Sequence, residues 1–269
     1  MPTTPQPAAC PAGASLDFST SLAVSRAYDY SLDAPAAGDD CKSPIMTVLH
    51  DLDGDGDLDA VVACGISAGF GSRVLVRELD KNAAGVMYYK ASGYSTALQF
   101  VRVSSVAVAD VDGDACPDLV VHDQGQIEGA PDPGHATVHL ILGTCDAQVE
   151  MHARFKLPEH GPQNAGASYA SPGGGDVGLF DLDGDLDLDV VGVTNGHDDP
   201  LERVYWYDND KEHPWGLDMT LRRDVDVDSA VGYYAGVAAR DMDGDGTVDV
   251  VVGSDEGVHI FYQTKPSTS

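Results

Sequence analysis

Four copies of one acidic motif constrain the fold of this chain more than any other feature. Each copy follows the pattern D-x-D-G-D-x-x-x-D. We call them loops 1 to 4 in chain order: Asp51–Asp59, Asp110–Asp118, Asp181–Asp189 and Asp241–Asp249. Their first residues lie 59, 71 and 60 positions apart. Self-similarity at a nearly constant spacing indicates an array of structural repeats.

Each loop lies between two short apolar segments. Segments with strand character precede the loops at 45–49, 105–109, 177–180 and 236–239, and β-branched runs follow them at 60–63, 119–121, 190–193 and 250–252. Such runs bounded by Gly and Asp are typical of buried strands. Each loop is therefore predicted to join the two strands of a hairpin.

Two further strands are predicted in each repeat. The third strands are expected at 73–79, 137–142, 204–207 and 258–262, and the fourth strands at 86–91, 149–155 and 217–222. The last repeat ends before a fourth strand. Leu16-Asp17-Phe18 resembles Leu217-Asp218-Met219, so a segment within residues 15–30 is expected to supply the missing strand.

Four-stranded repeats are the unit of a β-propeller. We therefore predict an all-β propeller of four blades of four antiparallel strands, the last blade closed by the N-terminal strand. Residues 1–13 are predicted to be a flexible Pro-rich tail and residues 14–265 a single domain, with repeats at about 44–96, 101–157, 175–225 and 235–264 plus 15–30. A β-sandwich or an open solenoid with acidic loops is the alternative.

The loops carry the chemistry of a calcium site. Carboxylates at positions 1, 3, 5 and 9 of a tight turn can face one centre, and Ca²⁺ takes six to eight oxygen ligands, many of them carboxylates. A backbone carbonyl near position 7 would add one ligand. Mg²⁺ keeps more of its waters and suits such a set less well. Position 4 is Gly in every loop, which permits a positive φ, and no loop has the Glu at position 12 of an EF-hand.

These loops, each followed by a Val-rich strand, resemble the FG-GAP/VCBS repeats of integrin-α-type β-propellers. Phe70-Gly71 echoes the dipeptide in that name, and Val204–Asp210 resembles a strand of bacterial members. The resemblance spans about Ile45 to Tyr262. It implies side-chain ligands at Asp51, Asp53, Asp55, Asp59, Asp110, Asp112, Asp114, Asp118, Asp181, Asp183, Asp185, Asp189, Asp241, Asp243, Asp245 and Asp249, carbonyl ligands at Asp57, Cys116, Asp187 and Thr247, and four Ca²⁺ per chain.

Two loops depart from the others at position 6. That position is Gly56 and Gly246 in loops 1 and 4, but Ala115 and Leu186 in loops 2 and 3. A slightly altered turn is expected in the latter pair. The chain also has length for four repeats rather than the seven of integrin propellers, which puts an integrin-like adhesion role in doubt.

The charge balance limits the partners. The formal net charge is −29, and the four loops hold 18 of the 44 acidic residues. This charge disfavours nucleic acids and anionic membranes. No apolar run is long enough for a transmembrane helix, and no signal peptide is visible in the sequence. We expect a secreted or cell-surface protein with a protein or glycan ligand.

Five cysteines carry a further prediction. In an antiparallel sheet of consecutive strands, Cys116 and Cys145 fall at adjacent strand ends, and so do Cys41 and Cys64. Both pairs are predicted to form disulfides, with Cys10 free on the tail. The alternative is five reduced thiols in a cytosolic protein.

Other candidate sites are weaker, and no catalytic residue is predicted. Gly65–Gly69 matches a G-x-S-x-G nucleophile motif but lacks the strand-to-helix context. His50 and His122 are expected to pack against or hydrogen-bond their loops. Aromatic residues 205–207 and Trp215 could bind a ligand or pack between repeats. We therefore expect a non-catalytic binding, adhesion or structural module, with a lectin-like module or a secreted hydrolase or lyase as alternatives.

Overall fold

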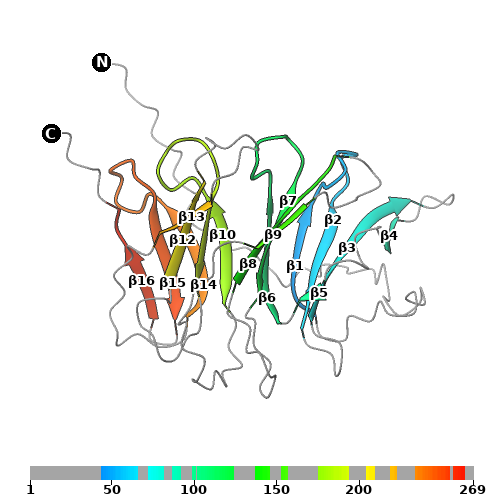
Figure 1. Ribbon diagram of the computed structural model, residues 1–269, viewed down its shortest axis with the longest axis horizontal. Helices are drawn as coiled ribbons and strands as arrows, with labels where there is room; N and C mark the ends of the chain where they lie inside the picture. The colour runs from blue at the N-terminus through cyan, green and yellow to red at the C-terminus, as the bar shows by residue number, and fades with distance from the viewer. Residues whose placement is uncertain are drawn as a thin grey trace, which may run out of the picture. The chain divides into compact units, whose positions relative to one another are not determined.

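The strands of the computed structural model form four separate antiparallel sheets (Figure 1). The structure describes residues 44–65, 72–81, 87–91, 99–100, 102–123, 137–145, 153–156, 175–193, 204–209, 219–222, 234–254 and 257–263. All of them belong to one compact unit, Ala36–Ser269. The predicted tail and the predicted closing strand lie outside these residues. The described part contains no helix with the length and apolarity that crossing a membrane requires.

Consecutive strands pair within each sheet. The first sheet contains β1 (Pro44–His50), β2 (Asp59–Cys64), β3 (Ser72–Lys81), β4 (Met87–Ala91) and β5 (Gln99–Phe100). The second contains β6 (Val103–Ala109), β7 (Asp118–Asp123), β8 (Thr137–Leu142) and β9 (Ala153–Lys156). The third contains β10 (Asp176–Phe180), β11 (Asp189–Val193), β12 (Val204–Asn209) and β13 (Met219–Arg222). The fourth contains β14 (Tyr234–Arg240), β15 (Asp249–Ser254) and β16 (Gly257–Phe261).

The repeat predicted from the sequence is confirmed at the level of these sheets. In all four, the acidic loop joins the first two strands of a hairpin, with the residue before the loop paired to position 9, as in His50 with Asp59. The short strand β5, which pairs with the start of β3, was not predicted. The fourth sheet has three strands among the described residues.

The second strands of the two inner hairpins, β7 and β11, are covered on both faces. β7 and β11 are buried along their whole length. Three core clusters result, and each contains side chains from two successive sheets: Val61 and Leu119 meet in the first cluster, Val120 and Tyr205 in the second, and Val191 and Val252 in the third. The sheets therefore pack in chain order.

The first strands of the sheets meet at equivalent positions. Met46, Ser105, Asp176 and Gly236 each lie five residues before a loop. Ser105 Oγ donates a hydrogen bond to Asp176 Oδ1 at 2.6 Å and lies 3.6 Å from Met46 Sδ. The Val237 N–H donates to Asp176 Oδ2 at 3.1 Å. The Asp176 carboxylate thus bonds to both neighbouring first strands.

Large apolar side chains remain exposed on the outer faces of the terminal sheets. Leu49 on β1 is 53% exposed and Val258 on β16 is 71% exposed. In the second, third and fourth sheets, the residue equivalent to Leu49 packs into the core cluster shared with the preceding sheet. The first sheet has no preceding repeat among the described residues, which leaves Leu49 uncovered.

One predicted disulfide is present. Cys116 in loop 2 is bonded to Cys145 just after β8, with Cα atoms 5.0 Å apart. Cys64 is disulfide-bonded as well. Its predicted partner, Cys41, lies outside the described residues, so that pairing stays a prediction.

Candidate metal centres

Hydrogen bonds from backbone N–H groups to aspartate side chains shape every loop. The carboxylate at position 1 accepts from the glycine at position 4 at 2.6–2.8 Å. The carboxylate at position 3 accepts from position 5 at 3.0–3.2 Å, and the carboxylate at position 5 accepts from position 7 at 2.7–3.1 Å. Side chains that hydrogen-bond their own backbone two residues on are typical of tight turns. The motif therefore specifies its own turn before any cation is considered.

The turn requires left-handed backbone at positions 4 and 6. The position 4 glycines have φ between 75° and 85°. At position 6, Ala115 and Leu186 have φ of 71° and 75°, close to the 90° of Gly56 and 86° of Gly246. The expectation of an altered turn in loops 2 and 3 was therefore wrong in this respect. Those loops keep the left-handed conformation, and residues with a Cβ adopt it at a cost in free energy.

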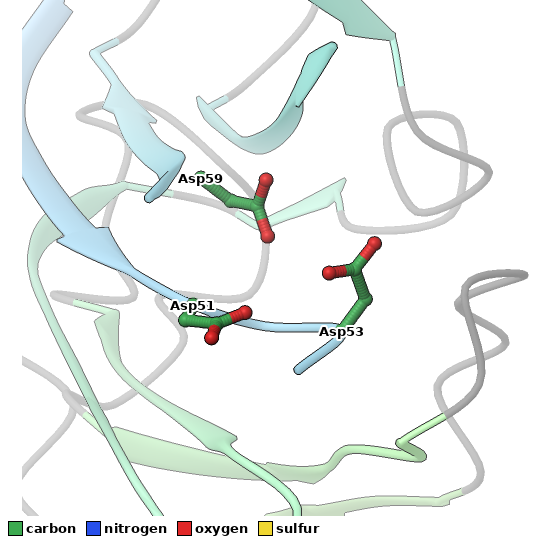
Figure 2. Close-up of side chains that lie close together, drawn as sticks. All are labelled: Asp51, Asp53 and Asp59. Carbon is green, nitrogen blue, oxygen red and sulfur yellow. The ribbon is translucent and has the colours of Figure 1, made fainter. Parts of the chain in front are cut away.

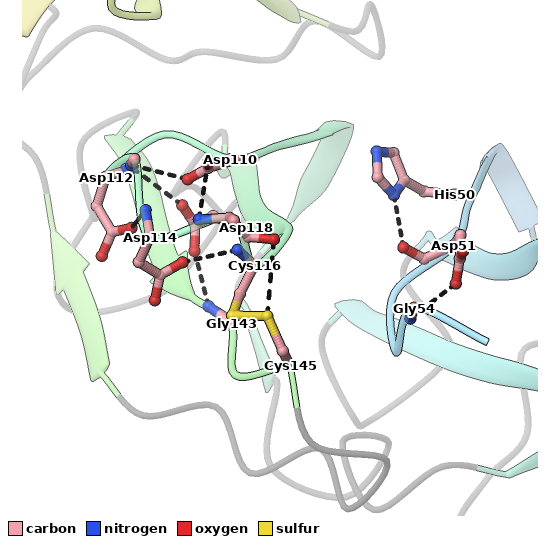
Figure 3. The surroundings of a disulfide bond; sticks show 12 residues. His50, Asp51, Gly54, Asp110, Asp112, Asp114, Cys116, Asp118, Gly143 and Cys145 are labelled. Atoms are coloured by element: carbon pink, nitrogen blue, oxygen red, sulfur yellow. Dashed lines mark hydrogen bonds between the residues drawn. A yellow bond between two sulfur atoms is a disulfide. The ribbon is translucent and has the colours of Figure 1, made fainter. Parts of the chain in front are cut away.

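The aspartate at position 9 is buried and connects two parts of its sheet. Its Oδ2 accepts the N–H of position 2 at 2.8–3.0 Å. Its Oδ1 accepts an N–H from within two residues of the end of the third strand at 2.8–2.9 Å, from Leu79, Gly143, Asn209 or Gln263. All four of these carboxylates, in Asp59, Asp118, Asp189 and Asp249, are at most 2% exposed. Position 9 thus fixes the loop against the neighbouring strand (Figure 3).

Burial makes the charge on Asp59, Asp118 and Asp189 unfavourable. Desolvation raises the pKa of Asp118 and of Asp189 to about 6, against the opposing effect of the backbone N–H donors. Desolvation also raises the pKa of Asp59 at position 9 and of Asp53, Asp112 and Asp183 at position 3, with further contributions from neighbouring acidic residues. A cation at the loop would offset both the lost hydration and the repulsion between like charges.

In each loop three carboxylates converge. Positions 1, 3 and 9 each offer one oxygen in loops 1, 2 and 4, and positions 1, 3 and 5 do so in loop 3, with the three oxygens within 4.8 Å of one another. Figure 2 shows Asp51, Asp53 and Asp59 turned toward a common space. The two positions that these groups leave out are position 5 in loops 1, 2 and 4 and position 9 in loop 3.

The donor set fits a hard cation. Every converging atom is a carboxylate oxygen, and Ca²⁺ prefers such ligands. Each oxygen has about two acceptor directions, so an oxygen that accepts a backbone N–H can also face a cation. The acidic clusters predicted from the motif are thereby confirmed as clusters that could hold a metal ion.

Two acidic residues outside the motif lie beside the loops and were missed from the sequence. Asp208 on β12, only 8% exposed, adds repulsion that raises the pKa of Asp183 and of Asp189, and Glu78 on β3 does the same for Asp53. Each directly precedes the residue whose N–H binds position 9. The pairing register of the third strand could have revealed Glu78 and Asp208 from the sequence. Pairing of β3 with β2, or of β12 with β11, brings the end of the third strand beside the loop.

The predicted roles of the histidines hold only in part. His50 Nδ1 lies 3.1 Å from the Asp51 carbonyl oxygen, so it bonds its loop as expected. His122 lies four residues beyond the end of loop 2 on β7, where it pairs with Ser105. It is fully buried, bonded to Ser104 Oγ at 2.5 Å and stacked on Tyr205, and burial lowers its pKa to about 4.

The aromatic cluster belongs mainly to the core. Tyr205 and Tyr207 are buried, and Trp206 packs against the third core cluster. Packing between repeats, one of the two expected roles, therefore accounts for these three residues. Trp215, His135 and most of the Gly65–Gly69 segment lie outside the described residues.

No protein-family model matches this chain, and no curated protein sequence matches it either.

Replacing Leu186 with Gly should stabilise loop 3. Glycine reaches a positive φ without a Cβ clash, and Leu186 is 85% exposed, so little packing is lost. We expect the free energy of unfolding, measured with urea, to rise by about 1 kcal/mol.

Gly56→Ala is the matched control, because a Cβ there meets nothing within 4 Å. It should lower the free energy of unfolding by a similar amount. If both changes left stability unaltered, the backbone at position 6 would not carry the inferred strain.

Replacing Asp118 or Asp114 with Ala should separate structure from cation binding. Asp118 accepts two buried N–H groups, from Val111 and Gly143, whereas Asp114 is exposed. With excess EGTA, Asp118→Ala should therefore lower the free energy of unfolding by about 2 kcal/mol and Asp114→Ala by less than about 0.5 kcal/mol. Equal effects in EGTA would contradict the structural role of position 9.

Proposed function

We propose that each of the four loops binds one Ca²⁺. The observation that carries this proposal is the recurrence of one arrangement in four sheets: a self-bonded turn, a buried position 9 and three converging carboxylate oxygens. The ligands are the aspartates at positions 1, 3, 5 and 9, with the carbonyl of position 7, a set that the resemblance to FG-GAP/VCBS repeats supports.

Calcium has a structural role in this proposal. Four or five carboxylates in one turn repel one another without a cation, and binding to the folded loops stabilises the folded state by mass action. Four bound Ca²⁺ also neutralise part of the formal charge of −29.

Elemental analysis after dialysis against calcium buffer should find four Ca²⁺ per chain. EGTA should lower the melting temperature, because the ion binds the folded loops and not the unfolded chain. Asp53→Ala should bind three ions, since Asp53 contributes to one loop only. A measured content of zero or one ion in the native chain would refute the proposal.

We further propose that the four sheets close into a β-propeller, with the first sheet packed against the fourth. Three observations support closure: the sheets pack in chain order, their first strands meet at equivalent positions, and the outer faces of both terminal sheets carry exposed apolar side chains. Leu49 occupies the position that contacts the preceding sheet in the other repeats. The segment at 15–30 would complete the fourth sheet beside β16.

Leu49→Asp tests closure. In a closed ring the carboxylate would be buried between two sheets, and the free energy of unfolding should fall by about 2 kcal/mol or more. On an open face the same change should have an effect of less than about 0.5 kcal/mol, which would contradict closure.

We expect light scattering to find a monomer, because in a closed ring the apolar faces of the terminal sheets cover each other. A second copy bound to those faces would instead make stability depend on protein concentration. Removing residues 1–25 should then leave β16 as an unpaired edge and cause association. A monomeric deletion variant of unchanged stability would rule out the N-terminal strand as the closing element.

The function that these features support best is that of a non-catalytic, extracellular binding, adhesion or structural module. The Cys116–Cys145 disulfide suits an oxidising compartment, and calcium-binding loops suit the high calcium levels outside cells. A protein or glycan at the cell surface is the proposed partner. Recovery of a partner from native cell surfaces with calcium, and its loss with EGTA, tests this. Binding that EGTA does not alter would separate the partner from the calcium loops.

A further inference from the structure

Two carboxamide side chains connect neighbouring acidic loops across the sheet interfaces. Asn209, at the end of β12, donates from Nδ2 to the carbonyl of Leu188 in its own loop 3 at 3.3 Å and to the carbonyl of Val111 in loop 2 at 3.0 Å. Asn209 is fully buried. Its backbone N–H also donates to Asp189 Oδ1, at 2.9 Å.

Gln263 repeats the arrangement one sheet later. With its amide nitrogen facing the carbonyl oxygens, it donates to Val248 in its own loop 4 and to Leu182 in loop 3, both at 2.9 Å. Its backbone N–H donates to Asp249 Oδ1. In both cases the carbonyls accepting these bonds belong to position 8 of the residue's own loop and position 2 of the preceding loop.

Among the residues that the structure describes, no such side chain connects loop 2 to loop 1. The residue equivalent to Asn209 in the second sheet is Gly143, whose N–H binds Asp118 Oδ1. A Cβ at this position would lie 2.0 Å from the carbonyl oxygen of Pro117, position 8 of loop 2. The close approach of the backbone therefore excludes a side chain that could reach Leu52 in loop 1.

We propose that Asn209 and Gln263 couple cation binding at loops 2, 3 and 4, whereas loop 1 binds its cation independently. The inference rests on the proposed calcium binding and concerns how the four sites communicate. Asn209 and Gln263 are positioning residues, because they act on the backbone that carries the ligands.

The coupling has a direct physical basis. The position 2 carbonyl is part of the peptide group that leads into the ligand at position 3, and the position 8 carbonyl leads into the ligand at position 9. A bound cation orders its loop, and the carboxamide then holds the facing peptide group of the next loop in place. The second loop loses less conformational entropy when it binds, which is positive cooperativity. Burial adds to the coupling, because an Nδ2–H group left without an acceptor is costly.

Removing one ligand from loop 2 and one from loop 1 tests this difference. Asp112→Ala should lose one Ca²⁺ and also weaken calcium binding at the coupled loops by roughly fivefold or more, within the usual range of coupling between sites. Asp53→Ala is the matched control at the same position of loop 1. It should lose one Ca²⁺ and leave the affinities of the other three unchanged. Calorimetric titration with Ca²⁺ measures both quantities.

Removing the carboxamide tests the connection itself. In an Asn209→Leu background, the Asp112→Ala change should no longer weaken binding at loops 3 and 4. Asn209→Gln, which retains the amide donor, should restore part of the effect. If Asn209→Leu impairs folding, Gln263→Leu serves instead, and Asp243→Ala in loop 4 should then cease to affect loops 2 and 3.

Hydrogen exchange gives a readout independent of affinity. With calcium present, Asp112→Ala should speed exchange of backbone amides in loop 3, and Asp53→Ala should not speed exchange in loop 2. Equal effects of Asp112→Ala and Asp53→Ala on the remaining sites, or persistence of the Asp112→Ala effect in Asn209→Leu, would overturn the coupling. A native chain that binds no calcium would instead refute the proposed function.

Discussion

The buried aspartate at position 9 is the interaction on which each sheet depends. One of its oxygens holds the start of the loop and the other holds the end of the third strand, so a single carboxylate fixes the hairpin and the next strand together. Burial of that charge is unfavourable by itself, as the raised pKa of Asp118 and Asp189 indicates. The proposed Ca²⁺ would be the compensation, and it would link cation binding to the integrity of the sheet.

The array is built by repeating one interface. The second and third sheets offer residues of their first strands to the preceding and following sheets, and their second strands, β7 and β11, contribute to both sides. Polar contacts follow the same register, with Asp176 bonded to the first strands on both sides. The outer faces of the terminal sheets have the same apolar character but lack a described neighbour, and this is the physical reason for proposing closure.

Repetition of the motif does not make the four loops equal. Loops 2 and 3 keep the left-handed conformation with Ala115 and Leu186, where loops 1 and 4 have glycine. Loops 1 and 3 have an extra carboxylate nearby, from Glu78 and Asp208. The carboxamide connections join loops 2, 3 and 4 but leave out loop 1. Four similar sequences can therefore give four sites of different affinity.

The sequence alone determined the parts of the protein that depend on local patterns. The spacing of aspartates and glycine predicted the loops, the β-branched runs predicted the hairpins, and strand order predicted the Cys116–Cys145 bond, because all three follow from neighbours along one antiparallel sheet. The tertiary structure decided what depends on stacking between sheets. It buried Tyr205 and His122 at one interface and brought Asn209 and Gln263 onto the preceding loops. Such contacts join residues distant in the chain, and no periodicity within one repeat specifies which side chain reaches the next.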